Sequence, residues 1–331
     1  MSAHLLEIAF LLASAAAIYF ACEFFVNGVE WLGRRLSVGS TATGTILAAI
    51  GTALPESVVT FVAVAFAHDD AQRQLGVGAA LGGPLVLATI AYAVVGATLL
   101  LADKRLKPAG VQDFRRLSRD QAWFLAIFVI KLAIGVVAFA WKPWLGLFFL
   151  GAYALYFWRE ITGEETGEEE KLDPLLIARK HASPPLSLIA LQTGAALVAI
   201  FLASSFFVHQ LDVLAPALGV APQVLALFLS PIATELPETM NAIIWVRQGK
   251  LRLALANISG AMMIQATVPT AFGVIFTPWM LDRTLLVAGG VTLAAVIALW
   301  AAFSGGWVNR WFLTGVAALY AIFVLIVVGL H

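Results

Sequence analysis

The six residues Gly51-Thr-Ala-Leu-Pro-Glu56 recur almost unchanged as Ala233-Thr-Glu-Leu-Pro-Glu238 in the second half of the chain. Both copies lie inside long apolar stretches, and an apolar composition does not by itself generate a shared Pro-Glu pair. With an offset of 182, residues 19–56 align with residues 201–238 without a gap, and twelve of the 38 positions are identical. The chain therefore contains an internal repeat, with this motif at its centre.

The composition around the motifs is that of a membrane protein. Of the 331 residues, 61% are apolar and only 12% are charged, whereas a soluble domain has about 25% charged residues. The apolar blocks are long enough to cross about 30 Å of hydrocarbon as helices, which satisfy their own backbone hydrogen bonds in lipid. We therefore expect an all-α membrane protein with ten transmembrane helices, at 4–32, 37–67, 75–101, 119–140, 143–159, 184–209, 217–246, 252–277, 284–303 and 307–330.

The basic residues predict the orientation. Sixteen of the 20 Lys and Arg residues lie in the loops that follow the odd-numbered predicted helices. Such loops stay cytoplasmic, so we expect both termini outside, in the cell's inner or plasma membrane. An acidic cytoplasmic linker at 160–183 separates five helices in residues 1–159 from five in residues 184–331. An odd number of helices in each half reverses the polarity of the second half, which predicts two inverted five-helix repeats.

Each motif (51–56 and 233–238) places a proline inside a predicted membrane helix. Proline has no N–H, so the carbonyl four residues earlier loses its helical partner. In each motif the threonine and the final glutamate are four residues apart, so they share a helix face. Each motif therefore offers a carboxylate, a hydroxyl and a freed carbonyl to a metal ion. These candidate ligands are Gly51, Thr52 and Glu56, and Ala233, Thr234 and Glu238, with Ser230 one turn earlier.

Carboxylates in the middle of a bilayer require a compensating charge. On insertion scales each costs roughly 2.5–3.5 kcal/mol. Bound cations or protons supply the compensation, and switching between the two is the chemistry of an antiporter. Ca²⁺ seeks 6–8 oxygen ligands, a number that both motifs together could supply. The alternative interpretation of Glu56 and Glu238 is pairing with a buried donor or extension toward the membrane surface.

The paired motifs resemble the two α-repeats of the sodium/calcium exchanger family, the cation/Ca²⁺ antiporters. The flanking stretches Glu23-Phe-Phe-Val-Asn-Gly28 and Leu253-Ala-Leu-Ala-Asn-Ile-Ser-Gly260 are similar to those around the family's repeats. The resemblance covers nearly the whole chain. It implies a ten-helix fold, outward termini and exchange of Na⁺ or H⁺ for Ca²⁺. It also assigns the family's signature ligands to Glu56 and Glu238, and to Thr52 and Thr234.

The chain departs from the family's pattern at several positions. The Ser that usually follows the Thr is Ala53 in the first repeat and Glu235 in the second, and the next helix has Gly82-Gly83-Pro84 where the family has Gly-Ser-Asn. We expect Glu235 to join the site. Asn257 and Gln265, two turns apart, either face the site or join two helices. Fewer neutral ligands and one more carboxylate suggest an altered stoichiometry or protons as the counter-ion.

Other classes of function fit less well. A net charge of zero offers no basic surface for nucleic acid, and a single cysteine with no His-Glu-x-x-His excludes the usual enzyme sites. We expect inorganic cations and the lipid bilayer as partners and no nucleic acid, while the sequence leaves the oligomeric state open. We expect no cofactor, with Ca²⁺, Na⁺ or H⁺ as the transported substrates. The alternatives left open are a proton-coupled exchanger of another cation and an uncoupled channel or sensor. Lys131, inside a predicted helix, is expected to pair with a carboxylate that the sequence does not identify.

Overall fold

The prediction of a helical protein is confirmed by a computed structural model that describes residues 2–39, 42–66, 70–102, 111–162, 172–217, 228 and 230–330. No strand occurs among these residues. The elements are α1 (Ser2–Arg35), η1 (Thr43–Ala48), α3 (Ala49–Ala65), α4 (Asp70–Val86), η2 (Leu87–Ala91), α5 (Tyr92–Leu101), α6 (Val111–Gly135), η3 (Lys142–Trp144), α7 (Leu145–Thr162), η4 (Leu176–Ala178), α8 (Leu186–Ala217), α10 (Ser230–Thr234), α11 (Leu236–Gln248), α12 (Leu251–Phe276), α13 (Arg283–Gly305), α14 (Arg310–Gly315) and α15 (Ala317–Leu330).

The predicted helices are found at the expected places in the described part of the chain. Six stretches are long and apolar enough to cross a membrane, by length and composition: 6–35, 76–101, 186–207, 251–276, 283–305 and 310–330. The total of ten membrane spans stays a prediction. Several spans are interrupted: π-helical turns precede α3 and follow α4, and a break separates α10 from α11.

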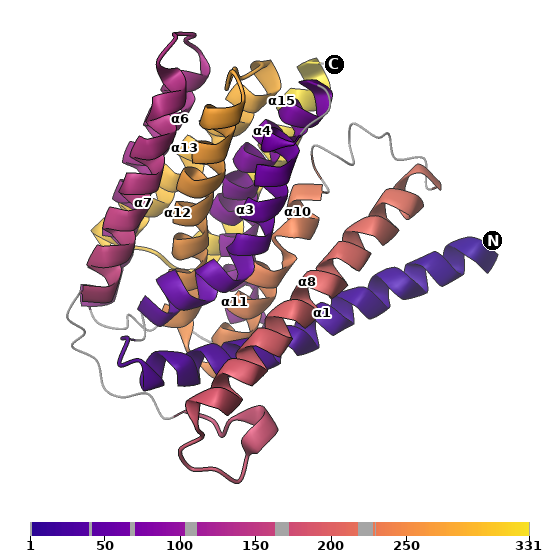
Figure 1. The fold of residues 1–331 in the computed structure, drawn as a ribbon, viewed down its shortest axis with the longest axis vertical. Coiled ribbons are helices and arrows are strands. Elements are labelled where there is room, and N and C mark those ends of the chain that lie inside the picture. Colours follow the sequence, from indigo (N-terminus) through magenta and orange to yellow (C-terminus); the bar gives the residue numbers. More distant parts are fainter. Residues whose placement is uncertain are drawn as a thin grey trace.

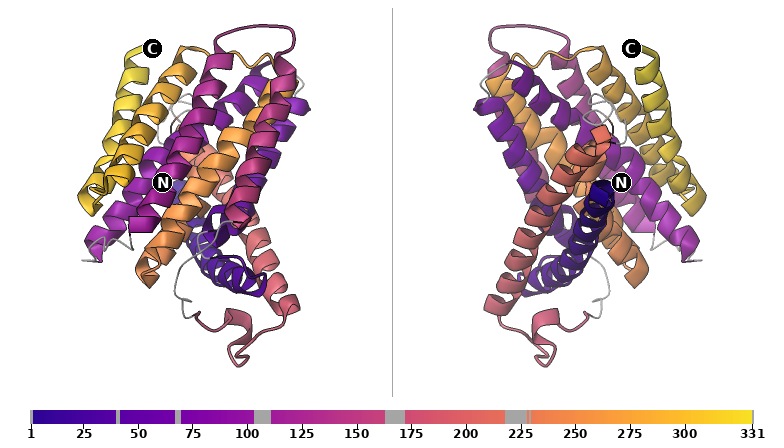
Figure 2. Two further views of the ribbon diagram at one scale, coloured as in Figure 1. Left: turned by 90° about the vertical axis from the view of Figure 1, so that its left-hand side faces the viewer. Right: turned by 90° about the vertical axis from the view of Figure 1, so that its right-hand side faces the viewer.

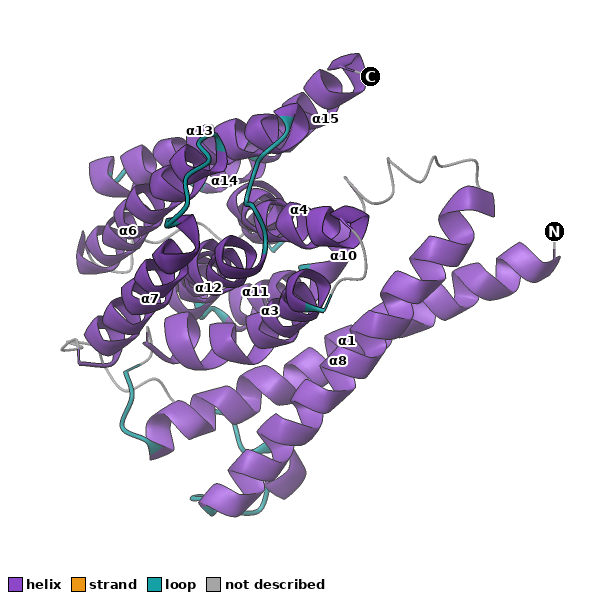
Figure 3. Ribbon diagram, turned by 45° about the horizontal axis from the view of Figure 1, so that its top comes forward, coloured by secondary structure: helices purple, strands orange, loops and turns teal. Residues whose placement is uncertain are grey.

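The helices form a bundle with a long helix pair at its side (Figure 1). Helix α12 lies inside the bundle, where it packs against α3, α4, α6, α7 and α11, and nearly all of its side chains are buried. Helices α1 and α8 instead pack mainly on each other and project from the bundle at an angle (Figures 1 and 3). The bundle therefore provides the enclosed interior in which polar groups can be held.

Helices α1 and α8 run antiparallel, as an inverted repeat requires. Near one end of the pair, Gln192 donates a hydrogen bond to Asn27 at 2.9 Å. At the other end the rings of Phe10 and Phe206 meet edge to face, 6.1 Å apart. The residue numbers rise along one helix as they fall along the other, and the right-hand view of Figure 2 shows the two helices side by side. These helices occupy equivalent places in the two halves of the chain.

Large apolar side chains cover the outside of the protein. On α8 alone, Leu191, Val198 and Leu202 are each about three-fifths exposed, and α1 and α15 carry further examples. An exposed apolar surface of this extent is unfavourable in water but matches a hydrocarbon solvent. The distribution therefore supports placement of the bundle in a membrane.

Small residues allow the first motif's helix to contact α12 closely. A Cβ atom on Gly44 of η1 would lie 2.9 Å from the Ala256 Cβ, and one on Gly260 of α12 would lie 2.1 Å from the backbone oxygen of Thr45. The two backbones approach each other because neither glycine has a side chain. This crossing fixes η1, and with it the start of α3, against the central helix.

The substitution Gly260→Ala tests this crossing. The new methyl group would collide with backbone atoms of η1, so we expect the free energy of unfolding to fall by about 1–3 kcal/mol. A thermal unfolding measurement on detergent-purified protein checks this. The control is Gly290→Ala on α13, where an added Cβ has no atom within 4 Å. Equal unfolding temperatures for the two variants would contradict the close packing.

Candidate functional site

The second motif lies at a break between two helices. Helix α10 ends at Thr234, Glu235 adopts a non-helical turn with φ −87° and ψ 8°, and α11 starts at Leu236. Pro237 is at the beginning of α11, the position where a missing N–H is best tolerated. The N–H of Glu235 still donates to Pro231 at 3.2 Å, and that of Thr239 to Glu235 at 3.1 Å. The break turns the carboxyl side chain of Glu235 into the bundle.

The first motif differs from the expectation that each motif's proline interrupts its helix. Helix α3 continues through Pro55 to Ala65, so the first span is not interrupted at its proline as the second is. The irregularity lies earlier, in the π-helical turn η1, where an extra residue is accommodated in the helix. Gly51 packs closely on α1, since a Cβ there would lie 2.6 Å from the Phe25 ring.

Glu235 and Gln265 meet directly, as the sequence analysis allowed. Both side chains are buried, and the Gln265 amide donates to Glu235 Oε1 at 2.5 Å. The site is closed on one side by Gly83 of α4, whose added Cβ would lie 2.2 Å from Gln265 Oε1 and 2.7 Å from Glu235 Oε1. Three helical segments distant in sequence thus converge on one carboxylate. The need for glycine at position 83 was not predicted, because it follows from this tertiary contact.

Glu238 lies one turn further along α11 in a polar stripe without exposure to solvent. Glu238 is 1% exposed, and Asn241, almost one turn later, is fully buried, as is Asn257 on the neighbouring α12. Within the described part of the chain, neither amide has a hydrogen-bond partner. Buried amides are almost always hydrogen-bonded, so these two side chains have unused capacity for a ligand. The site is also close to α1, because the Cys22 thiol contacts the Pro237 carbonyl at 3.8 Å.

The remaining predicted ligands are distributed as follows. Thr52 is buried and its hydroxyl donates to the Ala48 carbonyl at 3.2 Å, while Thr234 is half-buried and donates to the Pro231 carbonyl at 3.1 Å. The hydroxyl oxygen of Thr52 keeps its lone pairs for a cation. The side chains of Glu56 and Ser230 lie outside the described residues, so the pairing of Glu56 with Glu238 stays a prediction. Among the described side chains, no group of three or more His, Cys, Asp or Glu residues gathers as a metal cluster.

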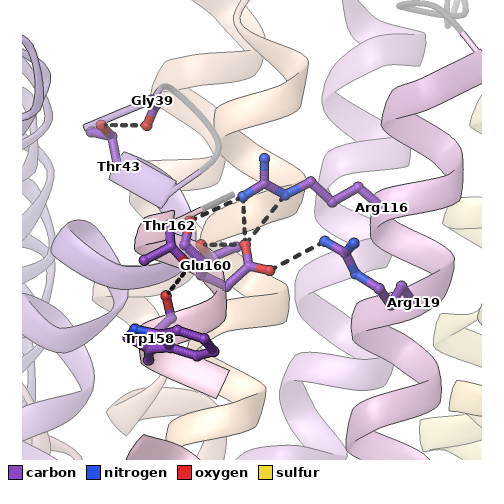
Figure 4. A network of polar contacts seen from close by, with 8 residues as sticks. Gly39, Thr43, Arg116, Arg119, Trp158, Glu160 and Thr162 are labelled. Carbon is purple, nitrogen blue, oxygen red and sulfur yellow. Dashed lines mark hydrogen bonds and ion pairs between the residues drawn. The ribbon is translucent and has the colours of Figure 1, made fainter. Parts of the chain in front are cut away.

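A second buried carboxylate, Glu160, fixes the first motif's helix from the other side (Figure 4). Glu160 is 1% exposed and pairs with Arg116 at 2.8 Å and with Arg119 at 3.4 Å. The hydroxyl of Thr45 donates to the same carboxylate at 3.3 Å. This network joins η1 to α6 and α7. The sequence analysis placed Glu160 at the start of the linker, but α7 continues to Thr162, so Glu160 is a buried helical residue.

Taken together, these features describe a helical membrane protein with a buried site of carboxylates and amides at interrupted helices. The sodium/calcium exchanger protein family matches residues 6–161 and 188–329, one copy for each half. The chain therefore belongs to this family, whose members are transporters and not enzymes.

Relatives and solved structures agree with this assignment. The chain is 25% identical over 299 residues to the putative antiporter CaxA of Alkalimonas amylolytica, with 88% of this chain and 87% of that protein covered. It is 26% identical over 285 residues to the inner membrane protein YrbG of Escherichia coli K12, covering 84% and 82%. Its fold matches the sodium-calcium exchanger NCX_Mj with a TM-score of 0.75 at 19% identity, over 97% of this chain and 99% of that one.

The substitution Gly83→Ala tests the contact between Glu235 and Gln265. The added methyl group would displace the Gln265 amide from the carboxylate, and a lost hydrogen bond to a charged group costs about 1.5–3 kcal/mol. We expect the unfolding temperature in detergent to fall accordingly. Gly78→Ala on the same helix is the control, because an added Cβ there meets nothing within 4 Å. Unchanged stability of the Gly83 variant would show that the two side chains are not held as described.

Proposed function

We propose that this protein is a secondary active antiporter that exchanges Ca²⁺ for Na⁺ or H⁺ by alternating access to the site around Glu235 and Glu238. The observation that carries the proposal is the burial of both carboxyl groups together with the amides of Asn241 on the same helix and Asn257 on the neighbouring α12. Within the described part of the chain, neither amide has a hydrogen-bond partner. Membership of the exchanger family and similarity to a protein named as a putative antiporter support the same class of function.

The electrostatics of the site favour a bound cation. Two carboxylates removed from solvent carry a desolvation penalty that a cation or a proton offsets. Glu235 accepts a hydrogen bond from Gln265, and because an amide is neutral, this bond compensates only part of a full negative charge. A cation that neutralises the remaining negative charge of the carboxylates can be exchanged only for another cation or a proton. Competition of two cations for the same carboxylates is the basis of antiport.

The ligand atoms suit a hard cation. Ca²⁺ prefers carboxylate, amide and backbone carbonyl oxygens, and all three occur here on Glu238, Asn241, Asn257 and the carbonyl of Ala233 that Pro237 leaves without a helical donor. Glu56, from the first motif, is proposed as the carboxylate on the opposite side. The replacement of a family serine by Glu235 adds a proton-accepting group, which supports H⁺ as a counter-ion beside Na⁺.

The position of α1 and α8 supports alternating access. The pair packs mainly on itself, while the face of α1 around Cys22 and Phe25 touches both motif regions, at Pro237 and at Gly51. A helix pair with its own packing can shift against a bundle without disrupting either body. Such a shift would change which side of the site is covered.

Ion uptake into proteoliposomes tests the proposal. Wild-type vesicles loaded with Na⁺, or at acidic internal pH, should accumulate radioactive Ca²⁺ against its gradient. Glu238→Gln should reduce uptake roughly 30-fold or more, because removal of a buried charge partner costs at least about 2 kcal/mol. Glu7→Gln, the same chemical change near the start of α1, should leave uptake unchanged.

Three outcomes would contradict the proposal. Equal uptake by wild type and Glu238→Gln would remove this carboxylate from the mechanism. Ca²⁺ flux that occurs only down its own gradient, without dependence on Na⁺ or pH, would indicate a channel. Accumulation of another divalent cation in place of Ca²⁺, driven by the pH gradient, would favour the proton-coupled exchanger of another cation.

A further inference from the structure

Lys131 is a fully buried lysine about one turn before the C-terminal end of α6. Its ammonium group donates a hydrogen bond to the backbone carbonyl of Ala80 on α4 at 2.6 Å and to that of Gln265 on α12 at 3.4 Å. The prediction of a carboxylate partner for Lys131 was wrong among the described residues, because its partners are main-chain oxygens of two different helices. The ammonium group of Lys131 is therefore bound by backbone carbonyl groups inside the bundle.

These two carbonyls share an unusual property. In an α-helix the carbonyl of residue i accepts from the N–H of residue i+4. The residue four positions after Ala80 is Pro84, and the residue four positions after Gln265 is Pro269; both prolines lie inside their helices. Because proline has no N–H, both carbonyls lack the helical donor. The ammonium of Lys131 thus occupies the point where two freed carbonyls, one from each repeat, converge.

Aromatic rings complete the surroundings of the ammonium group. The Nζ atom lies 5.3 Å from the ring centroid of Phe128 and 5.8 Å from that of Trp279, distances at which a ring face attracts a cation. The Trp279 indole also donates to the Lys131 carbonyl at 3.2 Å. Carbonyl groups without a helical donor and aromatic ring faces both bind cations, so these surroundings stabilise a positive charge at this position.

This place adjoins the carboxylate site. The residue whose carbonyl accepts from Lys131, Gln265, donates through its side chain to Glu235 Oε1 at 2.5 Å. Gly83, which contacts both Gln265 and Glu235, directly precedes Pro84. One residue of α12 therefore connects the ammonium group to the additional carboxylate of the second motif.

We propose that Lys131 is a tethered cation, which takes the place of one exchangeable monovalent cation and compensates one negative charge of the Glu235 and Glu238 site. The inference rests on the proposed function. Its consequence is that the fixed ammonium lowers the affinity of the site for mobile cations. Lys131 acts through Gln265 and the electrostatic field, and is therefore a positioning residue.

The charge-removing variant Lys131→Met separates this role from a purely structural one. A site with one more uncompensated negative charge should bind Ca²⁺ and Na⁺ about tenfold more tightly, as expected from Coulomb attraction inside a protein. Loss of a merely structural contact would instead loosen the site and weaken binding. Equilibrium binding of radioactive Ca²⁺ and, separately, Na⁺ to detergent-purified protein measures the sign directly.

Three further variants complete the experiment. Lys131→Arg keeps the charge and should bind as wild type does. Lys131→Gln keeps amide donors for the carbonyls without the charge, and should show the same tighter binding if the Met variant does not fold. Lys142→Met is the matched control, because Lys142 is also buried and donates to the carbonyls of Val137 and Trp279, at 2.8 and 3.0 Å, but not to carbonyls freed by proline.

The outcomes distinguish the inference from the proposed function. Tighter binding in the Met or Gln variant, with unchanged binding in the Arg and Lys142 variants, supports the tethered cation. Unchanged or weaker binding in the uncharged variants, beside a wild type that binds Ca²⁺, overturns the tethered cation and leaves the antiporter standing. A wild type that binds Na⁺ and not Ca²⁺ overturns Ca²⁺ as substrate, while the Na⁺ data still decide on Lys131. A wild type that binds neither cation overturns both.

Discussion

The need to compensate negative charge away from water governs this structure. Glu235 and Glu238 are 0% and 1% exposed, and carboxylates so placed persist only with a positive or hydrogen-bonding partner. Within the described part of the chain, Gln265 provides a neutral hydrogen-bond donor to Glu235. The ammonium group of Lys131 lies next to this site, because it donates to the backbone carbonyl of Gln265, and we assign the rest of the compensation to the transported cation. Under the proposed function, the requirement that makes the site costly to fold also makes it select positive species.

Interrupted helices supply the means of meeting this requirement. A regular helix consumes its own carbonyls, whereas prolines at 84, 237 and 269 leave the carbonyls of Ala80, Ala233 and Gln265 without helical donors. In a membrane such oxygens must face protein or ions. Two of them receive Lys131, and we assign the third to the cation site. Proline placement thus converts inert main chain into ligand groups at the centre of the bundle.

The sequence predicted the features that repeat and missed those that arise from tertiary contact. The duplicated motif and the helical class followed from spacing and polarity within an apolar background, whereas Gln265 was left open between facing the site and joining two helices. The partners of Lys131 could not be predicted, because α4, α6 and α12 meet only in three dimensions. The continuity of α3 through Pro55 also differed from expectation, and the irregular turn lies before this helix, at Thr43–Ala48. The burial of Glu160 was missed for the same tertiary reason, because its arginine partners are about 40 residues earlier in the chain.

The most direct test of the central claim is a crystal structure of the protein soaked with Ca²⁺ in the absence of Na⁺. The account predicts one Ca²⁺ ion inside the bundle, about 2.3–2.6 Å from carboxylate oxygens of Glu238, with Glu56 approaching from the opposite motif. Ca²⁺ found only at the surface, or a Glu56 side chain that points into the surrounding lipid, would contradict it.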